Sequence, residues 1–199
     1  MRKQIFILLF ALVLMISACA APQLKKNDLL IEPTINKVIS NENPVYLYVE
    51  TFGVARTISN PTVVGEARTG GFNVRSLIHS EEAIHLIVTD QIKKAFFKAG
   101  FKLEEKEKAD FTISGRIERF WVSERFGGFA ESARASVKYD LIIRNRQGRF
   151  LWGDNIVGRA TARDSIDVTK EDVPTLMNAL KESIESLFKN ESFWKTFEQ

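Results

Sequence analysis

The one cysteine of this 199-residue chain, Cys19, stands where its thiol could be modified. It follows Ile16, Ser17 and Ala18, an aliphatic residue and two small ones. A thiol can carry a lipid through a thioether, and small residues before it let a peptidase reach the bond between Ala18 and Cys19. This short segment therefore has the residue types that cleavage followed by acylation requires.

An apolar stretch precedes these residues. Arg2 and Lys3 are followed by 12 uncharged residues, Ile5 to Ile16. As a helix this stretch spans roughly 18 Å, which is short of the ~30 Å hydrocarbon core of a bilayer. It is typical of the hydrophobic region of an export signal rather than of a transmembrane helix.

Together these residues resemble the lipobox of bacterial lipoproteins. The resemblance implies a signal peptide over residues 1–18, cleavage between Ala18 and Cys19, and lipid attachment at Cys19. Two acyl chains would anchor the protein stably. Ala20, where Asp would favour inner-membrane retention, indicates the outer membrane with the protein facing the periplasm. The alternative is an ordinary signal peptide with a chance cysteine.

Composition excludes several classes of protein. A single Cys excludes an intramolecular disulfide and a Cys-rich zinc site, and two His leave little for a His-based metal site. Removal of Arg2 and Lys3 lowers the net charge of +3 by two, so charge does not argue for nucleic acid. We expect no metal and no cofactor. No catalytic motif is apparent, so we expect no enzyme unless carboxylates converge in a pocket.

Hydrophobic periodicity predicts one α+β domain over residues 29–199, after a lipidated N-terminus and flexible tether over residues 19–28. Alternation predicts strands at 45–49, 111–118, 133–144 and 150–160, and a short edge strand within 29–35. Apolar stripes predict helices at 81–99, capped by Ser80, and at about 173–189. Residues 53–79 have no clear period, and the alternative to a long loop there is an edge hairpin. The expected fold is an antiparallel sheet, a meander plus an N-terminal strand, with both helices on one face, and an aromatic tail (Phe193, Trp194, Phe197) docked on the core.

The polar face of the meander is rich in cations. Its basic residues are Arg116, Arg134, Lys138, Arg144, Arg159 and Arg163, interrupted by Glu118 and Asp140. This face could bind anionic envelope polymers or lipid headgroups. The alternative is a solvated face of mixed charge.

A second candidate surface is the hairpin end Phe126-Gly127-Gly128-Phe129. Two exposed aromatic residues beside a glycine pair could anchor a partner protein. They could equally fold back over the core.

The order of these elements, from Cys19 through the 45–51 strand, the helix ending in Gly100-Phe101 and the 109–162 meander to the last helix, resembles the YajG-type outer-membrane lipoproteins. That resemblance implies a periplasm-facing lipoprotein without known catalytic residues. Two functions follow as hypotheses. The first is a non-enzymatic envelope lipoprotein that binds a partner or supports an assembly. The second is an auxiliary lipoprotein that handles lipid or lipopolysaccharide in an envelope transport system.

Overall fold

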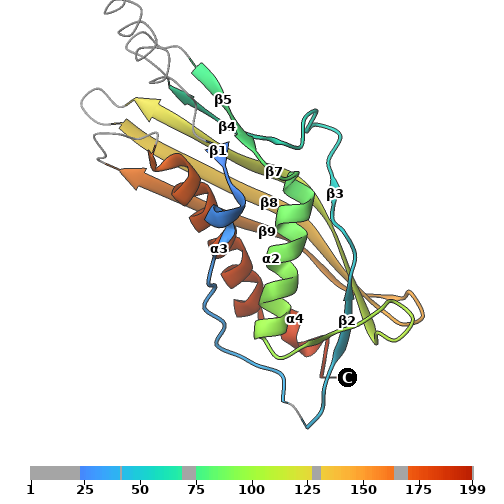
Figure 1. Cartoon of the computed structure of the whole chain (residues 1–199). Coiled ribbons are helices and arrows are strands. Elements are labelled where there is room, and N and C mark those ends of the chain that lie inside the picture. The colour runs from blue at the N-terminus through green and yellow to red at the C-terminus, as the bar shows by residue number, and fades with distance from the viewer. Residues whose placement is uncertain (1–22, 41, 69–74, 127–130, 164–169, 199) are drawn as a thin grey trace, which may run out of the picture.

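A computed structural model describes residues 23–40, 42–68, 75–126, 131–163 and 170–198. These residues form two layers, a large sheet and a layer of helices across one of its faces (Figure 1). The strands are β1 (Gln23–Leu24), β2 (Tyr46–Val49), β3 (Gly53–Val54), β4 (Val63–Arg68), β5 (Arg75–Ser80), β6 (Lys102–Leu103), β7 (Phe111–Phe126), β8 (Glu131–Asn145) and β9 (Phe150–Arg163). The helices are the short 3₁₀ helix η2 (Lys26–Leu29), α2 (Ile84–Lys98), α3 (Asp172–Lys189) and α4 (Glu191–Lys195).

The long strand β7 organises the sheet. On one side it pairs antiparallel with β8, which pairs antiparallel with β9. On its other side β2, β3 and β4 follow one another along β7, and all three are parallel to it. The sheet is therefore mixed, and the prediction of a purely antiparallel sheet was wrong. The predicted meander and the α+β class are confirmed.

The parallel pairs arise because α2 connects the N-terminal strands to the meander. A helical crossover returns the chain to the same end of the sheet, so the next long strand runs parallel to the first. Alternation of buried and exposed residues does not indicate the direction of a strand. For that reason the sequence did not show that β2 runs parallel to its neighbour in the sheet.

The predicted hairpin within 53–79 is present as β4 and β5, which pair antiparallel. It is not the edge of the sheet, because β1 pairs parallel with β5 on the outside. No strand lies between residues 29 and 35, where an edge strand was predicted.

The segment expected to be a flexible tether lies on the domain over its described part. In residues 23–28, Leu24 is only 1% exposed, and the carbonyl of Leu24 accepts a hydrogen bond from the Glu81 amide at 3.0 Å. The Lys26 amide donates to Glu81 Oε2 at 3.0 Å. Burial of one leucine and a two-residue strand pair hold this polar segment, which composition alone indicated to be free.

Helix α2 begins later than predicted. Ser80 remains the last residue of β5, where its amide donates to the Thr62 carbonyl, and its hydroxyl accepts from the Glu82 amide. The helix starts at Ile84 with Ala83 as its N-cap residue. The predicted cap thus closes the turn before the helix and not the helix itself.

Helix α3 packs very closely on the sheet. A Cβ at Gly158 of β9 would overlap the carbonyl oxygen of Ala179 and lie 2.5 Å from the amide nitrogen of Ser183. Below this contact the aromatic tail is buried as predicted, with Phe193 in ring contact with Phe96, Trp152, Phe188, Trp194 and Phe197. The helix layer and the inward face of β7–β9 form one core.

Candidate functional site

The N-terminal segment 23–32 crosses the helix layer between α2 and α3 (Figure 1). Leu24 and Leu29 are its buried contacts with the core. Asp28 Oδ2 accepts a hydrogen bond from the Lys25 amide at 2.9 Å, which closes the turn of η2. The segment therefore has a defined conformation and is held against the helix layer.

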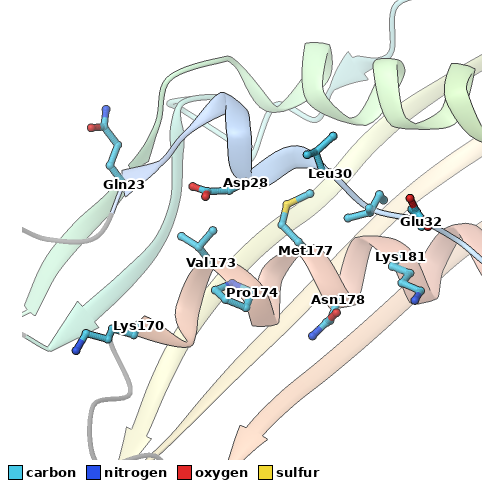
Figure 2. Close-up of a pocket in the computed structure, with 11 residues that line it drawn as sticks. Gln23, Asp28, Leu30, Glu32, Lys170, Val173, Pro174, Met177, Asn178 and Lys181 are labelled. Atoms are coloured by element: carbon cyan, nitrogen blue, oxygen red, sulfur yellow. The ribbon is translucent and has the colours of Figure 1, made fainter.

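A groove of about 710 Å³ separates this segment from α3. Figure 2 shows Met177 pointing from α3 toward the N-terminal segment, with Val173 beside it; Leu30 of that segment also lines the groove. Asp28 and Glu32 lie on the N-terminal wall, whereas Lys170 and Lys181 lie on the α3 side. The groove thus has an apolar middle and walls of opposite charge, which suits an amphipathic ligand.

A second groove, of about 590 Å³, lies on the other side of the same segment, against α2. Leu86, which is 49% exposed, and Lys93 are among its lining residues. Leu30 lines both grooves and is 85% exposed, the largest exposed fraction among the large hydrophobic side chains described. An isolated exposed leucine carries little meaning, but one held between two grooves offers an apolar contact to whatever enters either.

The six predicted basic residues lie along β7, β8 and β9. Strand register pairs Arg116 with Asp140, and Ser136 with Arg159. Since β8 positions 134, 138 and 144 alternate with the buried Ala135, Val137 and Ile143, they lie on the face away from the helices, here called the outer face. Arg163 pairs with Ser132, and its side chain lies outside the described residues.

Half of this face is neutralised by its own acids. Arg116 contacts Asp140 at 3.3 Å and Glu118 at 3.5 Å, and Lys138 contacts Glu118 at 2.7 Å. Arg144 donates to the Gly148 carbonyl at the far hairpin. The solvated, mixed-charge alternative describes this half well.

The other half is different. Arg134 and Arg159 are exposed, and in the described part of the chain neither guanidinium has a hydrogen bond or an ion pair; only the Arg159 amide is bonded, to Glu182 Oε2. Arg119, a residue that sequence reasoning missed, joins them on the outer face. A bulge between Ile117 and Arg119 shifts the alternation by one residue and sets Arg119 opposite Lys138.

A third cavity, of about 560 Å³, opens beside Arg119. Trp121 and Leu77 contribute to its lining, together with residues 57–60 of the preceding loop. Leu77 is 50% exposed. The outer face near this cavity therefore combines cations with apolar side chains.

Sequence reasoning also missed a buried pair of carboxyl groups. Asp172, in the first turn of α3, is fully buried, and Glu124 of β7 is 8% exposed. Burial, with the charge of Glu124 and a hydrogen bond to it, raises the pKa of Asp172 to about 8. Glu124 lies beyond the predicted strand 111–118, in the part of β7 that the prediction did not cover, so no inward-facing acid was expected there. The pair lines neither groove on the N-terminal segment.

Three predicted features fall outside the described residues. They are Ala18, Cys19 and the loop residues Gly127, Gly128 and Phe129; Phe126 ends β7, and nothing is described of its side chain. Within the described ranges no group of three or more His, Cys, Asp or Glu side chains could hold a metal ion. In the same ranges no helix is both long and apolar enough to cross a bilayer.

No protein-family model matches the chain, and no curated protein does either. Among solved structures, the fold is similar to that of protein XCC0632 from Xanthomonas campestris, described with the family model DUF330. The two chains are 13% identical, the match covers 90% of this chain and 100% of that one, and the TM-score is 0.58. At this identity the likeness concerns the fold alone.

Two further structures match with lower scores. The hypothetical protein CT253 from Chlamydia trachomatis is 8% identical, with 79% and 100% of the two chains covered and a TM-score of 0.48. A minor lipoprotein from Acinetobacter baumannii is 9% identical, with 75% and 94% covered and a TM-score of 0.42. Neither score establishes a common fold. The resemblance to YajG-type lipoproteins stays a prediction, since none of these structures is described as one.

Proposed function

We propose that this protein is a non-enzymatic envelope lipoprotein, anchored in the outer membrane through Cys19, that binds a partner or supports an assembly in the periplasm. One observation carries the proposal. Cys19 is only four residues before Gln23, where β1 begins, so the anchor is within about 14 Å of the folded domain. The grooves on segment 23–32 would then lie close to the bilayer surface.

The groove between this segment and α3 is the proposed binding site. Its apolar middle, Leu30, Val173 and Met177, would take the apolar face of a partner segment, and its opposed charged walls would set the orientation. The buried carboxyl pair does not argue for catalysis, because Asp172 is closed off from solvent and from this groove.

The second candidate function is the handling of lipid or lipopolysaccharide by an auxiliary lipoprotein of a transport system. The same groove supports it, since an acyl chain could lie along Leu30 and Met177 with an anionic head near Lys181. The two candidates differ in what occupies one site, so a single experiment separates them.

That experiment is photocrosslinking in the native envelope with a photoreactive phenylalanine at position 30. A crosslinked product that contains a second protein supports the first candidate, and a product heavier by one lipid supports the second. The same group at Phe150, which is 54% exposed at the start of β9, is the matched control. Identical products at both positions, or none at position 30, would contradict both candidates.

The anchor has its own test. Intact-mass analysis of the protein from its host should show a chain that begins at Cys19 and carries lipid. The Cys19→Ala variant should lose the lipid, and a high-salt wash that leaves the wild type in the membrane fraction should then release it. An unmodified thiol at Cys19 would overturn the anchored function.

A further inference from the structure

Arg119, Arg134 and Arg159, which have no side-chain hydrogen bond or ion pair within the described ranges, lie toward one end of the sheet. Register links Gln23 of β1 to His79, the neighbouring Ile78 to Gly65, and Gly65 to Val122 of β7. Val122 pairs with Ala135, and Ala135 pairs with Ala160. Ala135 follows Arg134 in β8, and Ala160 follows Arg159 in β9. The chain thus enters the sheet at the same level as these arginines.

Their lateral distance from that entry point is small. Five strand steps separate β1 from β9 in the order β1-β5-β4-β7-β8-β9, roughly 24 Å across the sheet. Because β1 runs parallel with β5, it enters from the end of the sheet where β5 begins, which is also the end where β7 finishes and β8 starts (Figure 1). A chain anchored just before Gln23 holds this end near the bilayer.

The side chains at this end suit a membrane surface. Ser136 lies between Trp121 and Arg159 in the strand register, and Arg134 lies between Ser123 and Thr161. Guanidinium groups and hydroxyls are the donors that bind phosphate oxygens, and a tryptophan favours the interface between headgroups and acyl chains. Leu77, half-exposed on the same face, adds an apolar contact.

We infer that this part of the outer face, here called the cationic end (Leu77, Arg119, Trp121, Arg134 and Arg159), rests on anionic phospholipid headgroups of the bilayer that holds the anchor. The inference rests on the proposed lipid anchor for its geometry. The cationic end is complementary in charge to anionic lipid, whereas the half of the face around Arg116 is already neutralised by Glu118 and Asp140.

The test uses vesicles and the mature chain with Cys19→Ser, so that no acyl group contributes. Vesicles of phosphatidylcholine with phosphatidylglycerol should bind this chain, and vesicles of phosphatidylcholine alone should bind it weakly. The double variant Arg134→Gln, Arg159→Gln should bind the anionic vesicles about 30-fold less, at about 1 kcal/mol for each arginine.

The matched control is Arg116→Gln, Arg144→Gln, which removes the same charge from the other part of the same face. We expect binding to change less than about 3-fold, since these arginines already have partners. Equal losses in the two double variants, or equal binding to both kinds of vesicle, would overturn the inference.

Tryptophan fluorescence gives a second readout of which face touches the lipid. Trp152 and Trp194 are 9% and 4% exposed, so lipids with brominated acyl chains should quench Trp121 selectively. Trp121→Phe should remove the quenched component. Binding without quenching would place another face on the bilayer and overturn the inference. None of these outcomes depends on Cys19, so a failed anchor and a failed docking surface remain distinguishable.

Discussion

Asp172 of α3 and Glu124 of β7 bring two carboxyl groups together in the interior, where the charge of Glu124 acts on Asp172. Burial first, and then the neighbouring Glu124, raise that pKa to about 8 from an ordinary 3.8. The native protein consequently keeps a proton on this pair at pH values where the unfolded chain has released it.

This pair predicts how stability depends on pH. A raised acid pKa contributes stability that is complete below about pH 4 and is lost as the pH rises toward about 8, since the native state binds more protons across that range. In the Asp172→Asn variant the amide of Asn can donate a hydrogen bond to Glu124 at every pH, so this position no longer has to bind a proton. The variant should reduce the fall in the free energy of unfolding between about pH 4 and pH 8, and should raise that free energy at pH 8 by about 1–3 kcal/mol.

Urea unfolding at pH 5 and pH 8 measures this effect. Glu104→Gln, at an exposed carboxyl in the loop after β6, is the control and should leave the pH dependence unchanged. The same decline in Asp172→Asn as in the wild type would show that the pair is not its source.

The contact between α3 and β9 predicts a large effect of one methyl group. Gly158→Ala places a Cβ against the backbone of Ala179 and Ser183, which cannot yield without moving the helix. We expect a loss of about 3 kcal/mol or more in the free energy of unfolding. Gly53→Ala, where the nearest atom to the new Cβ is 3.8 Å away, should cost less than about 1 kcal/mol in the same denaturation experiment. Similar losses at both glycines would argue against the close helix–sheet contact.

Leu24→Ala is expected to loosen the N-terminal segment rather than the whole domain. Truncating a buried leucine costs about 2–5 kcal/mol in a core that cannot relax. Here the loss in free energy cannot exceed the free energy that holds the N-terminal segment on the domain. That free energy is small, because the described part of β1 pairs with β5 through two residue pairs. Hydrogen exchange should accelerate at the Glu81 amide, which donates to the Leu24 carbonyl, and remain slow in β8. Uniform acceleration across β7–β9 would contradict this.

Phe193→Ala tests the aromatic tail as part of the core. The side chain is fully buried among five other aromatic rings, so its removal should cost about 3–5 kcal/mol of unfolding free energy. Replacing the exposed Phe97 of α2 (68% exposed) by Ala is the control and should change the melting temperature little. A mild effect at Phe193 would mean that α4 is not required for the fold.

The sequence predicted what depends on local periodicity. The inward residues of β8, from Ala133 to Ile143, are buried as the alternation predicts, and α3 spans 172–189 against a predicted 173–189. What it could not predict depends on partners far along the chain. The parallel pairing of β2 with β7, the docking of Leu24 and the bulge that turns Arg119 outward leave no local signal.

The candidate site divides in the same way. Strand register places Arg116, Arg134, Lys138, Arg144 and Arg159 on one face. Only tertiary contacts distinguish Arg116, which has acidic partners, from Arg134, which has none in the described residues. The groove beside Met177 was not foreseeable, because one of its walls was predicted to be a tether over 19–28 and an edge strand within 29–35.

The position of β7 has a consequence for synthesis of the chain. Strands β2, β3 and β4 all find their central neighbour in β7, which begins only at Phe111. The chain is synthesised from its N-terminus. The apolar side chains of these strands therefore stay exposed, without their neighbour β7, until more than half of the polypeptide has been made. The first half of this protein is thus exposed to aggregation while the second half is synthesised, and a chaperone that shields residues 46–68 would be needed most before β7, β8 and β9 are complete.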